Sequence, residues 1–326
     1  MPGVGYLAAR LGSGSDVLGY DDGRSADHDF GCRLTILVDK EHANVIEPVD
    51  DVLQRHLPQT FAGYPVRFAV SWDERAHHRV EIATVDGFAQ SRLGVPCDRP
   101  LTAVDWLCVT GQSVLETVAG PVFADDTAGY GRLRHRLLWY PDDVWRYVLG
   151  AAWARLEQEL PFVGRTGDVG DDVGSRLVAA RLARDICHLA FLLERSWSPY
   201  PKWMGSALGA LTAGPAVIER LSAALGARHW PEREAGLCAA IEALADRQRA
   251  VGLPTADAVI TTFFDRPYRA VDRETQVLLA NGVDNETLRR LPPGLGSIEQ
   301  WCDNVDLLSD PARRDATRAV YGQFQQ

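Results

Sequence analysis

The sequence has no long hydrophobic run and no closely spaced cysteine pair. Arg, Asp or Glu interrupts every strongly apolar stretch well before the ~18 residues that a membrane-spanning helix needs, so no segment predicts a membrane span. No CxxC pair occurs, and no basic-then-apolar signal opens the chain. We therefore expect a cytoplasmic protein with reduced thiols at its six scattered cysteines: Cys32, Cys97, Cys108, Cys187, Cys238 and Cys302.

Basic side chains are also scarce. There are 34 Lys and Arg residues against 44 Asp and Glu residues, which gives a formal net charge of −10. This balance argues against a general affinity for nucleic acid or anionic membranes, and it favours a neutral or cationic partner. Aromatic and aliphatic residues, by contrast, are plentiful: 46% of the chain is hydrophobic, which excludes a disordered chain. A length of 326 residues suggests two domains.

The pattern of the first part of the chain predicts an α+β domain over residues 1–135. Short β-branched runs alternate there with Gly, Asp and Pro clusters, which is typical of strands separated by turns. We expect strands over Leu34–Val38, Pro65–Ser71 and Arg79–Val85, joined in a mixed sheet with helices. The stretch 125–140 is the expected linker.

The second part, residues 136–326, predicts an all-α helical bundle. From Pro141 onward, apolar residues recur at three- and four-residue spacing. The Gly- and Asp-rich segment Gly164–Gly174 predicts a flexible loop between two helices. The expected helices are 143–160, 172–196, 216–225, 231–251 and 311–324.

The segment Gly12-Ser13-Gly14-Ser15 predicts a turn with little side-chain bulk. Backbone N–H groups in such a turn can approach an anion closely, and the serine hydroxyls can donate further hydrogen bonds. It lacks the Gly-Lys-Ser/Thr of a Walker loop, and it is neither a dinucleotide GxGxxG nor a GxSxG nucleophile elbow. Taken alone, the segment favours a plain flexible turn over a phosphate-binding one.

Two aspartates, Asp27 and Asp29, alternate in a segment that leads into an apolar run. Alternate residues of a strand point to one face, about 6.6 Å apart along the chain. Two carboxylates placed in this way can chelate a hard divalent cation, which suggests Mg²⁺. A solvated turn is the alternative interpretation of an isolated Asp-x-Asp.

The Gly-Ser turn followed by Asp-x-Asp resembles the nucleotidyltransferase superfamily, which includes DNA polymerase beta and the aminoglycoside nucleotidyltransferases. The resemblance implies that Gly12, Ser13 and Ser15 hold the nucleoside triphosphate, most simply ATP. It also implies that Asp27 and Asp29 hold two Mg²⁺ ions together with a third carboxylate on a neighbouring strand.

For that third carboxylate we choose Glu81, because apolar residues flank it in an expected strand. Asp86, at the strand's end, is the alternative. Asp73 and Glu74 are more distant choices, since their surroundings predict a hairpin turn. The pair His77-His78 has no third ligand at zinc spacing, and we interpret it as a loop.

His28 stands between the two aspartates where the superfamily usually has an aliphatic residue, and we expect it to point toward the domain interior. The same departure occurs in a narrower group of bacterial proteins that this chain resembles along most of its length. The shared stretches are Gly12–Ser15, Gly19–Asp22, Ser25–Gly31, Pro199–Trp203, Arg266–Tyr268 and Gln300–Asp303.

Pro199-Tyr200-Pro201-Lys202-Trp203 supports two interpretations: a rigid aromatic wall with Lys202 on a phosphate or substrate, or a tight turn between helices with Lys202 solvated. The resemblance favours the first. Farther upstream, Arg181, Arg184 and His188 fall at short spacing on one expected helix, and we interpret them as an ordinary helix with exposed arginines.

The resemblance implies a Mg²⁺-dependent nucleotidyltransferase that moves NMP, from ATP, to a hydroxyl or similar nucleophile of a small molecule. The acidic composition suggests a cationic acceptor such as an amino sugar. Two alternatives stay open: nucleotidylation of tRNA or of a protein, and nucleotide binding without catalysis.

Overall fold

A computed structural model describes residues 3–22, 30–70 and 73–324. The chain divides into two compact units. The first comprises residues 1–101, 112–138 and 309–315, and the second comprises residues 102–111, 139–308 and 316–326. The predicted candidate linker 125–140 is not an open connection, because it contains a helix (α6, Gly129–Arg136) whose Tyr130 and Leu133 are buried.

The first unit is built on a five-stranded mixed sheet with strand order β5-β6-β2-β1-β7. Only β2 and β6 run parallel among these pairs, with Thr35 opposite Glu81. The strands are β1 (Tyr6–Ala9), β2 (Arg33–Val38), β5 (Arg67–Val70), β6 (Asp73–Thr84) and β7 (Val122–Asp125), and a small hairpin pairs β3 (Thr60–Phe61) with β4 (Tyr64–Pro65).

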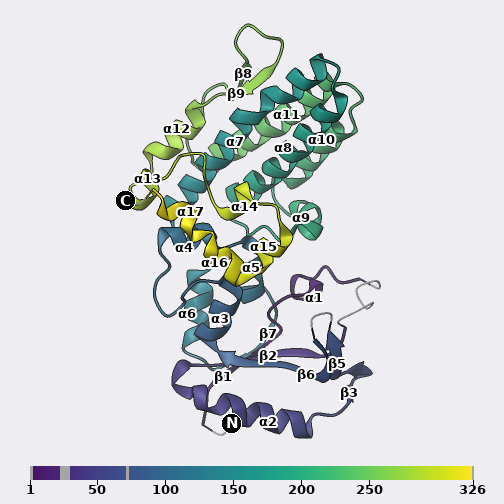
Figure 1. The fold of residues 1–326 in the computed structure, drawn as a ribbon, viewed down its shortest axis with the longest axis vertical. Coiled ribbons are helices and arrows are strands. Elements are labelled where there is room, and N and C mark those ends of the chain that lie inside the picture. The colour runs from purple at the N-terminus through teal and green to yellow at the C-terminus, as the bar shows by residue number, and fades with distance from the viewer. Residues whose placement is uncertain (1–2, 23–29, 71–72, 325–326) are drawn as a thin grey trace. The chain divides into compact units, whose positions relative to one another are not determined.

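Helices cover both faces of this sheet, with α2 (Ile46–His56) on one side and α3 (Val85–Leu93) and α6 on the other (Figure 1). Buried aliphatic residues of β1 and β2, such as Leu7 and Leu37, form the core between these layers. The remaining helices of the unit are α1 (Ser15–Leu18), η1 (Lys40–Val45), α5 (Gly111–Val118) and α16 (Pro311–Ala316).

The second unit is a helical bundle centred on α7 (Asp142–Asp168), which packs against α8 (Asp172–Leu193), α11 (Trp230–Ala250) and α12 (Glu274–Asn281) (Figure 1). Its elements are otherwise α4 (Ala103–Cys108), α9 (Pro201–Leu208), α10 (Gly214–Gly226), the hairpin β8 (Ile260–Thr262) and β9 (Arg269–Val271), α13 (Glu286–Arg290), α14 (Ile298–Trp301), α15 (Val305–Ser309) and α17 (Arg318–Gly322). Mixed α/β structure followed by a helical region is therefore confirmed.

The connection between two helices predicted over Gly164–Gly174 is present but much shorter than expected, because α7 continues to Asp168 and α8 begins at Asp172. Two glycines of α7 lie against bulky rings. A Cβ on Gly167 would come within 2.4 Å of Trp230, and one on Gly164 within 2.6 Å of Tyr268. The glycines therefore serve close helix packing, and their low helix propensity is overridden by tertiary contact.

Two further predictions need correction. His77 and His78 lie within strand β6, where we expected a loop, because the hairpin with β5 extends this strand. The expected helix over 311–324 divides into α16 and α17. Within the part of the chain that the structure describes, no helix is long and apolar enough to cross a membrane.

Candidate functional site

The Gly-Ser segment forms a turn directly after β1. Gly12 and Gly14 adopt φ values of 90° and 134°, which side chains with a Cβ rarely adopt. The buried Gly12 N–H donates to the Glu116 carbonyl at 2.8 Å, whereas Ser13 and Gly14 are exposed. Ser15 begins the short helix α1. The turn thus presents two exposed residues, Ser13 and Gly14, between a hydrogen-bonded Gly12 and the start of α1 at Ser15.

Arg10 holds this turn in place, and the sequence analysis did not single it out. Its guanidinium donates to both carboxylate oxygens of Asp16, at 2.7 and 3.0 Å, and to the Ser13 carbonyl at 2.8 Å. It also donates to the Leu11 carbonyl. Only 11% of the Arg10 side chain is exposed. A two-point ion pair of this kind fixes geometry as well as charge.

Glu81 lies on the same face of the sheet as the turn. Its neighbour on the parallel strand is Thr35, and register-paired side chains point to the same side. The Thr35 hydroxyl lies 3.4 Å from the Leu11 amide, at the start of the turn. The Glu81 side chain is 41% exposed, so its carboxylate is accessible to a ligand.

Arg92 of α3 connects Glu81 with the turn. Its guanidinium forms an ion pair with the Glu81 carboxylate and packs 4.9 Å from the centre of the Phe88 ring. A Cβ built on Gly12 would lie 3.4 Å from Arg92 Nη2. The structure therefore brings Gly12, Glu81 and Arg92 together. No local pattern marks Arg92, since it lies in a helix eleven residues beyond Glu81.

Asp27, His28 and Asp29 lie outside the described residues. The chain is described again from Phe30, and β2 begins at Arg33. The roles predicted for the two aspartates therefore stay predictions. Among the described residues, no group of three His, Cys, Asp or Glu side chains could hold a metal ion.

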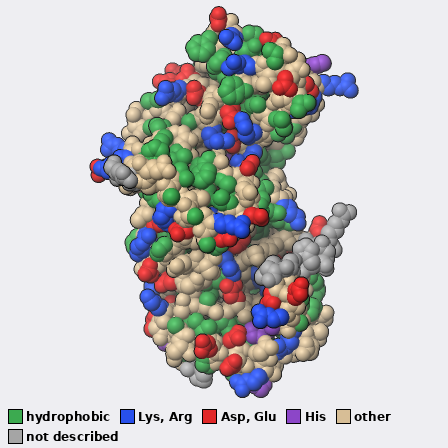
Figure 2. Space-filling view, viewed as in Figure 1, with side chains coloured by type: hydrophobic (Ala, Val, Ile, Leu, Met, Phe, Trp, Pro, Cys, Tyr) green, Lys and Arg blue, Asp and Glu red, His purple; other side chains and the backbone are tan. Residues whose placement is uncertain are grey.

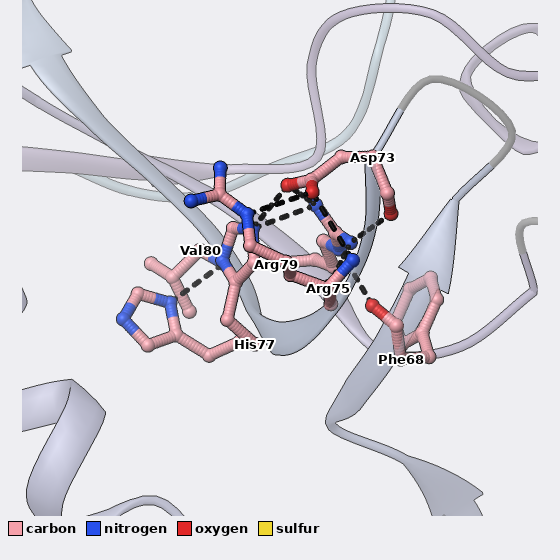
Figure 3. A network of polar contacts seen from close by, with 7 residues as sticks. Phe68, Asp73, Arg75, His77, Arg79 and Val80 are labelled. Carbon is pink, nitrogen blue, oxygen red and sulfur yellow. Dashed lines mark hydrogen bonds and ion pairs between the residues drawn. The ribbon is translucent and has the colours of Figure 1, made fainter.

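The alternative acids have other surroundings. Asp86 lies in the first turn of α3, where a negative charge stabilises the helix N-terminus. Asp73 belongs to a polar network on the β5–β6 hairpin (Figure 3). Hydrogen bonds from His77, at 2.7 Å, and from the Arg75 backbone and guanidinium hold the pKa of Asp73 well below its usual range. Arg79 Nε donates a hydrogen bond to the Phe68 carbonyl oxygen at 2.9 Å, which ties this network to β5.

In the helical unit, the predicted segment Pro199–Trp203 divides into buried and exposed parts. Pro199 is buried before α9, whereas Lys202 is exposed on the first turn of that helix, with Nζ 4.9 Å from the Trp203 ring. The expectation of exposed arginines on α8 is only partly met. Arg181 pairs with Glu159, but Arg184 donates to the carbonyls of Glu299 and Cys302 at 3.0 and 3.3 Å.

The comparisons with known proteins are sparse. A family model described as a domain of unknown function, DUF4037, matches residues 106–204, which include parts of both compact units. No curated protein matches the sequence. The solved structure of a nucleotidyltransferase-like protein from Exiguobacterium sibiricum aligns with a TM-score of 0.34 and 11% identity, covering 76% of this chain and 71% of that one. The chain is thus similar to the DUF4037 family over these residues, less than a third of its length.

Proposed function

We propose that this protein is a Mg²⁺-dependent nucleotidyltransferase that transfers NMP, from ATP, to a hydroxyl of a small molecule. The observation that carries the proposal is the common location of the anchored Gly12–Gly14 turn, the accessible Glu81 carboxylate and the Arg92 guanidinium. Asp27 and Asp29 precede β2, the strand beside Glu81. Phosphate-holding groups and carboxylates on one sheet face are what this chemistry needs.

The turn and Arg92 are the groups that we assign to the triphosphate. Ser13 and Gly14 are exposed residues, and in the proposal their backbone N–H groups donate to phosphate oxygens together with the Ser13 and Ser15 hydroxyls. Arg92 would contribute a positive charge beside Gly12. Lys202, which is exposed, is proposed as a further phosphate contact.

The donor chemistry fits Mg²⁺. Asp27, Asp29 and Glu81 would hold it, since hard cations prefer carboxylate oxygens. When bound, Mg²⁺ neutralises phosphate charge and stabilises the charge that develops during transfer. Glu81 uses one oxygen, Oε2, for its ion pair with Arg92. In the proposal the carboxylate serves either as a metal ligand or as the base that accepts the proton of the attacking hydroxyl.

One observation favours a second function, nucleotide binding without turnover. The Arg92 guanidinium already neutralises the Glu81 carboxylate. If this ion pair persisted with nucleotide bound, Glu81 would be a poor metal ligand and a poor base, because its negative charge would be engaged.

The test is to incubate the protein with each α-labelled NTP and a panel of hydroxyl-bearing small molecules as acceptors, with and without Mg²⁺, and to measure pyrophosphate release, label transfer to the acceptor and thermal stabilisation. The wild type and the Asp27→Ala/Asp29→Ala variant are compared. Mg²⁺-dependent stabilisation and release that the variant loses would support transfer. Stabilisation without release would support the second function. If the wild type showed no stabilisation and no release, both functions would be excluded.

A further inference from the structure

The last turn of α3 carries Arg92, whose guanidinium pairs with Glu81 in the candidate site. Gly94 ends the helix in the left-handed conformation, with φ 72°, and its N–H donates to the Gln90 carbonyl at 2.9 Å. Four residues after Arg92 the chain has Pro96, which carries no N–H. The Arg92 carbonyl therefore lacks the donor that a continuing helix would supply, and it needs a partner from elsewhere.

A segment near the C-terminus of the chain supplies that partner. Residues 309–315 belong to the same compact unit as α3. The guanidinium of Arg314, in α16, donates a hydrogen bond to the Arg92 carbonyl, 222 residues earlier in the chain. Arg314 is only 1% exposed. A positive charge at this point is also favourable for the helix, because the C-terminal end of a helix dipole is negative.

The start of α16 lies directly against the end of α3. A Cβ on Gly94 would come within 2.6 Å of the Pro311 carbonyl oxygen, so only glycine leaves room for this approach. The first turn of α16 is held in turn by Asp310, which accepts from the Ala312 and Arg313 amides at 2.9 and 3.2 Å. Close backbone contact therefore fixes α16 against the end of α3.

This arrangement links the backbone of Arg92 to the place of its side chain. A buried guanidinium is costly unless its N–H groups are hydrogen-bonded, and a carbonyl that loses its donor is costly as well. Without Arg314, the last turn of α3 would fray, as helix ends without partners do. A shift of the backbone at Arg92 would carry its guanidinium away from Glu81 and Gly12.

We propose that Arg314 is a positioning residue, which acts through the backbone of Arg92 and holds the Arg92 guanidinium beside Gly12 and Glu81 for nucleotide binding. Its effect on the nucleotide rests on the proposed function, in which Arg92 contributes a charge to the triphosphate. The role requires no contact between Arg314 and the nucleotide. It makes the C-terminal segment a part of the machinery of the sheet unit.

The first test is a double-mutant cycle. Calorimetric titration with a non-hydrolysable ATP analogue and Mg²⁺ gives the Kd of the wild type, Arg314→Met, Arg92→Met and the double variant. We expect Arg314→Met to weaken binding about tenfold, which is the order of one hydrogen bond to a charged group, and Arg92→Met to weaken it at least as much. In the Arg92→Met background, Arg314→Met should change Kd by less than about twofold, because no guanidinium is left to position.

The matched control is Arg313→Met. Arg313 lies on the same helix, but its side chain is 58% exposed and pairs with Asp310 within the helix, so this variant should bind as the wild type does. An equal loss from Arg314→Met in both backgrounds would show a general structural role and overturn the proposal, as would wild-type affinity in Arg314→Met. If Arg314→Met does not fold, Arg314→Lys takes its place in the cycle, because it keeps the buried charge; it should weaken binding at least about threefold, only where Arg92 is present.

The second test needs no nucleotide. Arg92 Nε is buried without a hydrogen-bond partner among the described residues, so the NMR signal of its N–H, assigned with Arg92→Lys in ¹⁵N-arginine-labelled protein, reports its surroundings. Arg314→Met, or Arg314→Lys in its place, should shift or broaden this signal, whereas Arg313→Met should leave it unchanged. Failure of the wild type to bind the analogue would contradict the proposed function, and this signal would then decide the role of Arg314. An unchanged signal in the Arg314 variant would overturn that role.

Discussion

At the scale of single residues, the account depends most on Glu81. We expect Glu81→Gln to lower nucleotidyl transfer by at least about 100-fold, since a charged metal ligand or base contributes several kcal/mol. Stability should change by no more than about 1 kcal/mol, because the ion pair with Arg92 is partly exposed. The matched variant Asp86→Asn should keep its turnover. The measurement is pyrophosphate release alongside urea unfolding, and a reversed ranking of the two variants would assign the role to Asp86.

His188 supplies a prediction on pH dependence. Burial, with Arg184 and Arg155 nearby, lowers the native pKa of His188 to about 3 from an ordinary value of 6.5, so between these pH values the unfolded chain binds a proton that the native chain does not. The free energy of unfolding should therefore fall as pH drops from 6.5 toward 3, by up to about 1.4 kcal/mol per pH unit from this group.

Urea unfolding of the wild type and of His188→Leu over that pH range checks this prediction. The variant should lack this part of the decline. Asp185, whose pKa burial raises, acts in the opposite sense and is present in both proteins, so the difference between them isolates His188. Equal slopes for the two proteins would show that His188 titrates normally.

Residue-level sequence reasoning identified the Gly12–Ser15 turn and placed Glu81 in a strand, and the structure has both. It missed Arg10 and Arg92. Arginine is common on surfaces, and its role here depends on which turn or strand the folded chain brings beside it. Such long-range neighbours leave no periodic signal in one sequence.

At the scale of elements, the periodicity of hydrophobic residues predicted the strands and helices where one face of the element is buried. The prediction failed where tertiary packing overrides the low helix propensity of individual residues. Pro161, Gly164 and Gly167 all favour a break, yet α7 passes through them because Gly164 and Gly167 accommodate Tyr268 and Trp230. The histidines of β6 were misplaced for a similar reason, since strand pairing with β5 carries polar residues along the edge of the sheet.

Gly167→Ala tests this explanation of α7. A Cβ there would overlap Trp230, so we expect a loss of about 1–3 kcal/mol in the free energy of unfolding. Gly205→Ala in α9 meets nothing within 4 Å and should gain up to about 1 kcal/mol from helix propensity. Urea denaturation of both variants decides the matter, and a stabilised Gly167→Ala would mean that the helix breaks before that glycine.

At the scale of the whole molecule, the division into units is not a single cut in the sequence. Residues 102–111 belong with the helices, and residues 309–315 belong with the sheet. Composition changes along the chain gave one boundary, at residues 135 and 136. Residues 102–111 and 309–315 each belong to the unit that does not contain their neighbours in the sequence. Long-range contacts decide this assignment, and the composition of a segment carries no information about such contacts.

The net charge of −10 gives a further prediction. Acidic and basic side chains are interspersed over the face shown in Figure 2. We therefore expect no tight binding of bulk tRNA at physiological salt, because phosphate binding needs a concentrated basic field. Fluorescence anisotropy with labelled tRNA measures this. Strong binding that weakens steeply with salt would favour a macromolecular acceptor.

The most direct test of the central claim is calorimetric titration with a non-hydrolysable ATP analogue, in Mg²⁺ and in EDTA. The account predicts saturable binding that requires Mg²⁺ and is lost in the Asp27→Asn/Asp29→Asn variant, while the variant keeps its circular dichroism spectrum. Binding that is the same in EDTA and in the variant, or no binding by the wild type, would contradict it.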